Sequence, residues 1–191
     1  LALCTKNLPE PAIVPTDYFN TVLWTGNATD DRNITGVGFS PNMVWIKSRG
    51  TTNDNMIFDT QRGVGKYLRT NSTDAQDSNA DTLQSFDADG FQIGADSRLN
   101  TNNDPVSSWN WYAATAVSGN SGGSGDDVPY TGTVNTDAGF SIIKYGGNGV
   151  TGHQVPHHLG VVPDMIWIRN ITTQSWNCWW PNTQMGATKM M

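Results

Sequence analysis

Apolar and polar residues alternate along most of this chain, in short runs separated by turn-forming residues. The clearest run is residues 43–49, Met-Val-Trp-Ile-Lys-Ser-Arg. Successive side chains of a β-strand point to opposite faces, so Trp45, Lys47 and Arg49 would share one face of such a strand. No stretch repeats convincingly at the 3.6-residue period of a helix. Many short strands at this spacing predict an all-β fold, an antiparallel and jelly-roll-like β-sandwich.

The alternation predicts eight strands in the first part of the chain and three in the second. Asn, Asp and Gly, which tolerate the backbone conformations of tight turns, fill the segments between them. Residues 72–81 are the one candidate for a helical turn. The predicted strands are 18–25, 33–38, 43–48, 55–60, 66–70, 82–86, 91–93 and 106–113, followed by 140–145, 165–171 and 176–180.

Part of the sequence occurs twice. Residues 19–27 are echoed by 140–148, with an offset of 121 (140 − 19). Pro41–Lys47 recurs as Pro163–Arg169, offset 122 (163 − 41), and Gly63–Leu68 as Gly186–Met191, offset 123 (186 − 63). Three collinear matches with so little drift indicate a duplicated folding unit. Residues 69–117 of the first copy have no counterpart in the second.

The repeat divides the chain into four parts. Residues 1–17, with three prolines, are predicted to form a linker or arm, and 18–117 the first β-sandwich repeat. Residues 118–128 form a Gly/Ser-rich flexible linker, and 129–191 a partial second repeat. A sheet cut midway exposes unpaired backbone groups. We expect either a continuation of the polypeptide or a strand from another subunit to cover that edge.

Composition argues against some classes of partner and does not decide whether the two cysteines form a disulfide. The formal net charge of −6 argues against a nucleic-acid partner, because phosphate binding needs clustered Lys and Arg. No apolar run approaches the length of a membrane span. Cys4 and Cys178 lie near opposite ends of the chain, so two buried thiols and one disulfide are both possible.

The strand around Trp45 is the first candidate for a binding surface. Its predicted face carries Trp45, Lys47 and Arg49, and the second copy repeats it with Trp167 and Arg169. An indole beside a cation suits cation–π contacts, and an exposed indole can stack on a sugar ring. The alternative is a central strand buried on both faces, with its basic groups reaching the rim.

Two further groups of tryptophans have different interpretations. Trp176 aligns with Asp54 of the first copy, so it is the indole of the 176–180 cluster most available to a partner. Packing in a core or an interface is the alternative for this cluster. Trp109 and Trp111 share one face near the end of the first copy, and we expect them to close its core.

Metal-binding and catalytic patterns are weak. Asp87 and Asp89 have the D-x-D-G spacing of a calcium loop, but the downstream acid of an EF-hand is missing, and Asp-Gly is also ordinary turn chemistry. His153, His157 and His158 lack a well-placed Cys or carboxylate to complete a zinc site. No nucleophile motif or phosphate-binding loop is present. The sequence therefore predicts no catalytic residue, no cofactor and no enzyme activity.

Residues 18–113, with "YFNTVLWTGN", "SPNMVWIKSR" and "SFDADGFQIG", resemble a repeat domain of tail-fibre and other structural proteins of marine and cyanobacterial phages. Residues 139–191 are similar to a partner copy, and 3–13 to the segment that leaves a preceding SPRY or concanavalin-like lectin domain. His157-His158 and the Tyr that follows Trp111 depart from the commoner His-Gly pair and Lys of that family.

This resemblance implies a non-enzymatic virion structural or appendage protein, located on a tail fibre or the capsid surface and involved in particle assembly or host attachment. Its expected partners are other virion subunits, with a homo-oligomer among the expected assemblies, and a host-surface glycan. The alternative is a carbohydrate-binding, lectin-like adhesion module that uses Trp45 with Lys47, or Trp176, as its platform.

Overall fold

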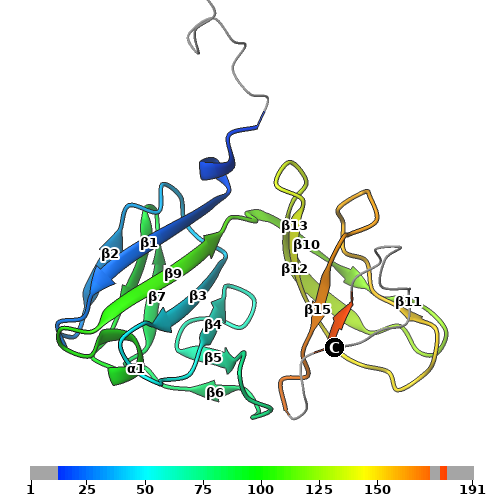
Figure 1. The fold of residues 1–191 in the computed structure, drawn as a ribbon. Coiled ribbons are helices and arrows are strands. Elements are labelled where there is room, and N and C mark those ends of the chain that lie inside the picture. Colours follow the sequence, from blue (N-terminus) through cyan, green and yellow to red (C-terminus); the bar gives the residue numbers. More distant parts are fainter. Residues whose placement is uncertain (1–12, 173–176, 180–191) are drawn as a thin grey trace, which may run out of the picture.

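The structure is a computed structural model, which describes residues 13–172 and the backbone of 177–179. Strands make up 43% of the structure and helices 4%, so the all-β prediction is confirmed. The two copies form two lobes that lie beside each other, the first drawn in blue to green and the second in yellow to orange (Figure 1). Among the described residues, no helix has the length and apolar character needed to cross a membrane.

The first copy is a sandwich of two antiparallel sheets. The larger sheet has the order β1 (Phe19–Thr25), β9 (Pro105–Trp111), β3 (Met43–Ser48), β4 (Met56–Asp59), β5 (Lys66–Arg69), β6 (Asp77–Ser78). The smaller sheet has the order β2 (Arg32–Thr35), β8 (Gly90–Ile93), β7 (Leu83–Asp87). The last strand of this copy, β9, thus lies between β1 and β3, with Trp109 opposite both Thr21 and Trp45.

The core lies between the two sheets and uses one face of each strand. In β3 the buried residues Val44 and Ile46 alternate with the half-buried Trp45 and Lys47, as a period of two requires. The smaller sheet and the short helix α1 (Ser97–Asn100) cover this face. The buried core residues are Ile34, Val37, Phe39, Val44, Ile46, Met56, Phe58, Tyr67, Leu83, Phe91, Ile93, Leu99 and Val106.

Asn100 of α1 fixes the connection between β1 and β2. Its side chain is fully buried, and Oδ1 accepts hydrogen bonds from the Asn27 backbone N–H (3.0 Å) and Arg32 Nη1 (2.9 Å). Its Nδ2 donates to the carbonyl oxygens of Thr29 (2.7 Å) and Gly94 (3.2 Å). A buried amide with this many partners holds the surrounding loops in one arrangement.

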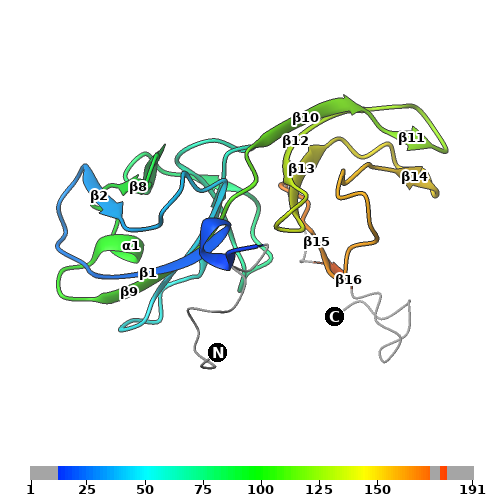
Figure 2. The ribbon, with the colours of Figure 1, turned by 90° about the horizontal axis from the view of Figure 1, so that it is seen from above.

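Within its described residues, the second copy has three smaller antiparallel sheets. The largest is β10 (Thr115–Asn120), β12 (Pro129–Asn135), β13 (Phe140–Tyr145) in that order. The others pair β11 (Gly122–Gly123) with β14 (His153–Gln154), and β15 (Ile166–Ile168) with β16 (Asn177–Trp179). Figure 2 shows β10 leading out of the first lobe across the second.

Two local predictions differ from the structure. Residues 118–128 were expected to be a flexible linker, but β10 extends to Asn120 and β11 follows it, since pairing with β12 and β14 supplies hydrogen bonds that Gly/Ser composition does not forbid. The candidate helical turn at 72–81 contains the short strand β6 instead. Of the predicted arm at 1–17, the described part carries a single turn of 3-10 helix, η2 (Pro15–Asp17).

Candidate functional site: the interface between the two copies

The outer face of the large sheet, opposite to the core, carries tryptophans that meet the second copy. The ring centroids of Trp45 and its cross-strand neighbour Trp109 lie 5.5 Å apart. Trp167, the counterpart of Trp45 in the second copy, packs edge-on against Trp45 at 5.8 Å with an interplanar angle of 84°. Edge-to-face pairs at this separation are a favoured aromatic geometry. A residue thus contacts its own repeat counterpart, as happens across two-fold interfaces.

A second aromatic contact lies on the same face, two residues farther along β9 than Trp109. Trp111 is 5.0 Å from Phe19 in its own copy and 6.0 Å from Phe140, with which it is stacked at an interplanar angle of 25°. Phe140 is the repeat counterpart of Phe19. Trp111 therefore contacts the same position in both copies.

The prediction that Trp109 and Trp111 close the core is wrong. Both lie half-buried on the outer face, while Val106, Ser108 and Asn110 of the same strand are buried on the other face. Asn110 Nδ2 donates to the Asn20 carbonyl oxygen and to Ser108 Oγ, each at 3.0 Å, while its Oδ1 is buried without a hydrogen-bond partner. The hydrogen bonds of Asn110 Nδ2 offset much of the cost of burying polar residues on this face.

The loop between β5 and β6 adds polar contacts to the interface. Arg169 Nη2 donates to the carbonyl oxygen of Asp74, and the Gln76 backbone N–H donates to the Ile171 carbonyl oxygen at 2.8 Å. Burial lowers the pKa of Arg169, and the charge of Asp74 opposes that shift. Residues 70–76 of the first copy are thereby joined to the segment that follows β15.

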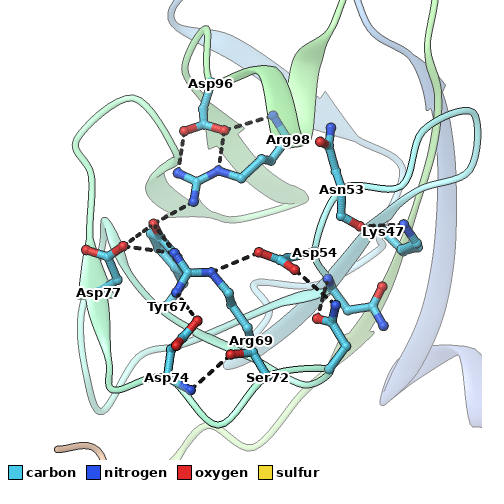
Figure 3. Close-up of polar contacts among 12 residues, drawn as sticks. Lys47, Asn53, Asp54, Tyr67, Arg69, Ser72, Asp74, Asp77, Asp96 and Arg98 are labelled. Atoms are coloured by element: carbon cyan, nitrogen blue, oxygen red, sulfur yellow. Dashed lines mark hydrogen bonds and ion pairs between the residues drawn. The ribbon is translucent and has the colours of Figure 1, made fainter.

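The same loop is held from within its own copy by Arg69 (Figure 3). The Arg69 guanidinium pairs with three carboxylates: Nε with Asp54 at 3.0 Å, Nη1 with Asp74 at 3.2 Å and Nη2 with Asp77 at 3.0 Å. Its side chain is 15% exposed, whereas the three carboxylates are 38–63% exposed. One half-buried cation thus pairs with acids from the loops on both sides of β5.

Tyr67 and Arg98 extend this network toward the helix. The Tyr67 hydroxyl donates to Asp77 Oδ2 at 2.8 Å and accepts from Arg98 Nη1 at 2.7 Å, and Arg98 also bonds both oxygens of Asp96. The guanidinium carbons of Arg98 and Arg69 lie 4.8 Å and 5.3 Å from the Tyr67 ring centroid, within cation–π range.

These contacts shift the acid–base equilibria of the network. Burial raises the pKa of Tyr67, and the hydrogen bond to Asp77 raises it further. The Tyr67 hydrogen bond is the main cause of the lowered pKa of Asp77. For Asp96, burial opposes ionisation, but hydrogen bonds from Arg98 outweigh it and the pKa is lowered. Both carboxylates are therefore ionised at neutral pH and paired with the two arginines.

This arrangement stabilises loops rather than presenting reactive groups. The arginines and carboxylates of the network are engaged with one another, and Tyr67 is 1% exposed. We refer to Tyr67, Arg69, Asp77, Asp96 and Arg98, with Asp54 and Asp74, as the arginine network. Sequence analysis missed it, because its members become neighbours only through the pairing of β5 with β4 and β6 and through the position of α1.

The predicted site residues have separate positions in the structure. Trp45, Trp167 and Arg169 are brought together at the interface. Lys47 Nζ donates to the carbonyl oxygens of Asn53 (2.6 Å) and Thr51 (3.3 Å), so it stabilises the loop that follows β3. Arg49 is exposed at the end of β3, beside an open hollow lined in part by Leu23 and Trp24.

Three other predicted features fall outside the described residues. Trp176 is one of them. Cys4 and the side chain of Cys178 are the others, so the pairing of the two cysteines stays a prediction.

The acidic turn and the histidines have local contacts. Asp89 accepts hydrogen bonds from the backbone N–H groups of Gly36 (3.1 Å) and Gly38 (2.6 Å), which lower its pKa, and Asp87 accepts from Ser85 Oγ at 2.8 Å. His158 Nε2 lies 2.9 Å from the Tyr130 hydroxyl. In the part of the chain that the structure describes, no three His, Cys, Asp or Glu side chains are placed to hold a metal ion.

The fold and the interface define a class of protein: a β-sandwich module joined to a partial copy of itself. The chain belongs to the family described as Domain of unknown function (DUF7483), whose model matches residues 14–191. The matched range spans both copies and the interface between them. Neither the curated proteins nor the solved structures contain a match to this chain.

Proposed function

We propose that this protein is a non-enzymatic structural module of a phage particle, located on a tail fibre or the capsid surface and acting in assembly or host attachment. The observation that carries the proposal is the interface between the two copies. Repeat units that pack on one another through equivalent residues build extended, rigid structures without any catalytic group. Virion appendages require such structures.

The interface supports rigid coupling in two ways. Trp45 with Trp167 and Trp111 with Phe140 form aromatic contacts at two separate places on the same sheet face. The loop contacts of Asp74 and Gln76 add hydrogen bonds at a third place. Contacts at three separate places restrict rotation of one copy against the other.

The environment of Trp45 and Lys47 does not favour the lectin alternative. A sugar-binding platform needs an open indole face and free polar groups beside it. Here Trp45 is packed between Trp109 and Trp167, and the ammonium group of Lys47 is bound to backbone carbonyls. This argument does not extend to Trp176.

The proposal is tested on particles of a phage that encodes this chain. We expect mass spectrometry to find the chain in purified particles, and immunogold labelling to place it on an appendage or on the capsid. A Trp167→Ala phage should incorporate less of the protein, because an aromatic contact between the copies is lost. Val150→Ala, at an exposed position of the same copy, is the matched control.

Two results would contradict the proposal. One is the absence of the chain from purified particles. The other is release of reducing sugar from host polysaccharide by the purified chain, which would make it an enzyme. A glycan-array signal that Trp176→Ala abolishes would support the lectin alternative instead.

A further inference from the structure

The loop between β13 and β14 carries the single Asn-Gly pair of the sequence, Asn148-Gly149. Every other asparagine is followed by a residue with a side chain. In an Asn-Gly pair the next backbone nitrogen can attack the side-chain amide carbon, because glycine has no Cβ to keep the two atoms apart. This reaction, deamidation, converts asparagine to aspartate without an enzyme.

The attacking nitrogen of this pair is free in the structure. Gly149 is exposed with a φ of 73°, and no atom lies within 4 Å of the position that a Cβ would take. Among the described residues, nothing accepts a hydrogen bond from its N–H. Asn120 differs, because the N–H of the residue that follows it, the buried Ser121, donates to the Val128 carbonyl oxygen at 2.8 Å. The same attack is therefore hindered at Asn120.

The side-chain amide of Asn148 is held in place and polarised. Its Oδ1 accepts a hydrogen bond from the Val150 N–H at 3.1 Å. A donor at this oxygen stabilises the negative charge that develops there when the nitrogen attacks. The Nδ2 donates to the carbonyl oxygens of Ser124 (3.0 Å) and Asp126 (3.1 Å). Gly125 makes room for this amide, since a Cβ there would lie 2.8 Å from Nδ2.

We propose that Asn148 is a modification site that deamidates spontaneously and thereby releases the loop of residues 124–126. The Gly149 nitrogen bonds to Cγ of Asn148, the Cγ–Nδ2 bond breaks, and Nδ2 leaves as ammonia with the proton of the Gly149 N–H. Water then opens the resulting succinimide ring at either carbonyl carbon, giving a hydroxyl to that carbon and a proton to the ring nitrogen. The products are aspartate and isoaspartate. This inference does not depend on the proposed function.

The product lacks the donor that joins the two loops. A carboxylate at position 148 only accepts hydrogen bonds, as do the carbonyl oxygens of Ser124 and Asp126 that it would face. The Ser124 N–H, which donates to the Gly152 carbonyl oxygen at 3.1 Å, and the two-residue pairing of β11 with β14 lose this support. Both strands lie at the end of the second lobe away from the first copy (Figure 2), so the interface between the copies should be unaffected.

Peptide mapping of the full chain over time, in mildly alkaline buffer, tests the site. Chromatography with mass spectrometry separates asparagine from its two products at each position. We expect conversion at Asn148 to be roughly tenfold or more faster than at Asn120 in the folded chain. The ratio should fall in denaturant, which also frees the Ser121 N–H. No conversion at Asn148 in the folded chain overturns the proposal, and so does a ratio that denaturant leaves unchanged.

The variant Asn148→Asp tests the consequence for the loop. Asn120→Asp is the matched control, since it adds the same charge at an exposed position of the same copy. Hydrogen exchange at the Ser124 amide should be roughly tenfold faster in Asn148→Asp, because both hydrogen bonds to residues 124–126 are lost. It should not change in Asn120→Asp. Unchanged exchange at Ser124 in Asn148→Asp, or equal acceleration in the two variants, overturns the release of the loop.

Discussion

Ile46 and Ile168 are the same residue in the two copies, yet one is fully buried and the other nearly half exposed. Both lie in a strand with the pattern apolar-Trp-Ile-basic. The first is covered by a second sheet, and no described element covers the second in that way. The comparison teaches that alternation in a strand determines which residues share a face, whereas a distant segment determines whether that face becomes a core.

On the outer face of the same strands, Trp45 and Trp167 differ from the two isoleucines in that they contact each other. Trp167 keeps 38% of its surface exposed, while Trp45 is half-buried. The predicted alternative of a strand buried on both faces therefore describes β3 better than an open binding platform does. Its outer face is covered by the second copy rather than by its own.

The largest expected effect comes from truncating the two isoleucines. Ile46→Ala should lower the free energy of unfolding by about 2–5 kcal/mol, because it leaves a cavity in a packed core. Ile168→Ala should cost less than about 1 kcal/mol, since its side chain is partly solvated already. Chemical denaturation of both variants checks this, and equal losses would contradict the difference between the copies.

Truncating the interface tryptophans should have the next-largest effect on the free energy of unfolding. Trp45→Ala should cost about 2 kcal/mol, since the half-buried indole loses contacts with both Trp109 and Trp167. A double-mutant cycle with Trp167→Ala should give a coupling energy of about 0.5–1.5 kcal/mol. A cycle of Trp45 with Tyr145, an exposed aromatic residue of β13, is the control. Coupling no larger than in the control would mean that the tryptophans do not join the copies.

Removing the charge of Arg69 should have a smaller effect on the free energy of unfolding. Arg69→Met should cost about 1 kcal/mol, because the partner carboxylates are partly exposed and their ion pairs are screened by water. It should also speed hydrogen exchange at the Gln76 amide, which bonds to Ile171 across the interface. Lys144→Met, at an exposed cation of β13, is the matched control. No change at Gln76 would show that the arginine network does not position this loop.

The smallest effect is a dependence of stability on pH. The pKa of Asp77 is lowered in the folded protein, so its stabilising effect is complete above the unfolded value of about 3.9 and is lost as the pH falls through the lowered value. Unfolding midpoints between about pH 5 and 2 should therefore fall less steeply for Asp77→Asn than for the original protein. Parallel curves for the two proteins would be the contrary result.

Local features of the fold could be predicted from the sequence. The strand at 43–48 and its two faces match β3, because alternation over six residues depends on the strand alone. The partners of each strand could not be predicted: β9 inserts between β1 and β3 from far along the chain. For the same reason the inner face of β9 was misassigned, since alternation does not tell which of two faces meets the core.

Only part of the interface could be predicted from the sequence. The repeat identified Trp45 and Trp167 as equivalent residues, but no pattern indicated that they would touch. Arg69, Asp77 and Arg98 gave no signal, because isolated charges in turn-rich segments resemble ordinary surface residues. β10 was missed since Gly, Ser and Asn are poor strand formers, and pairing with β12 overrides that preference.

Native-state hydrogen exchange of the chain alone, compared between β3 and its counterpart β15, tests the difference between the copies most directly. The account predicts slow exchange at all amides of β3, which is paired with β4 and β9 and covered by a second sheet. In β15, which pairs with β16 alone among the described strands, it predicts fast exchange at amides that do not face β16. Protection along β15 equal to that of β3 would contradict an open second copy.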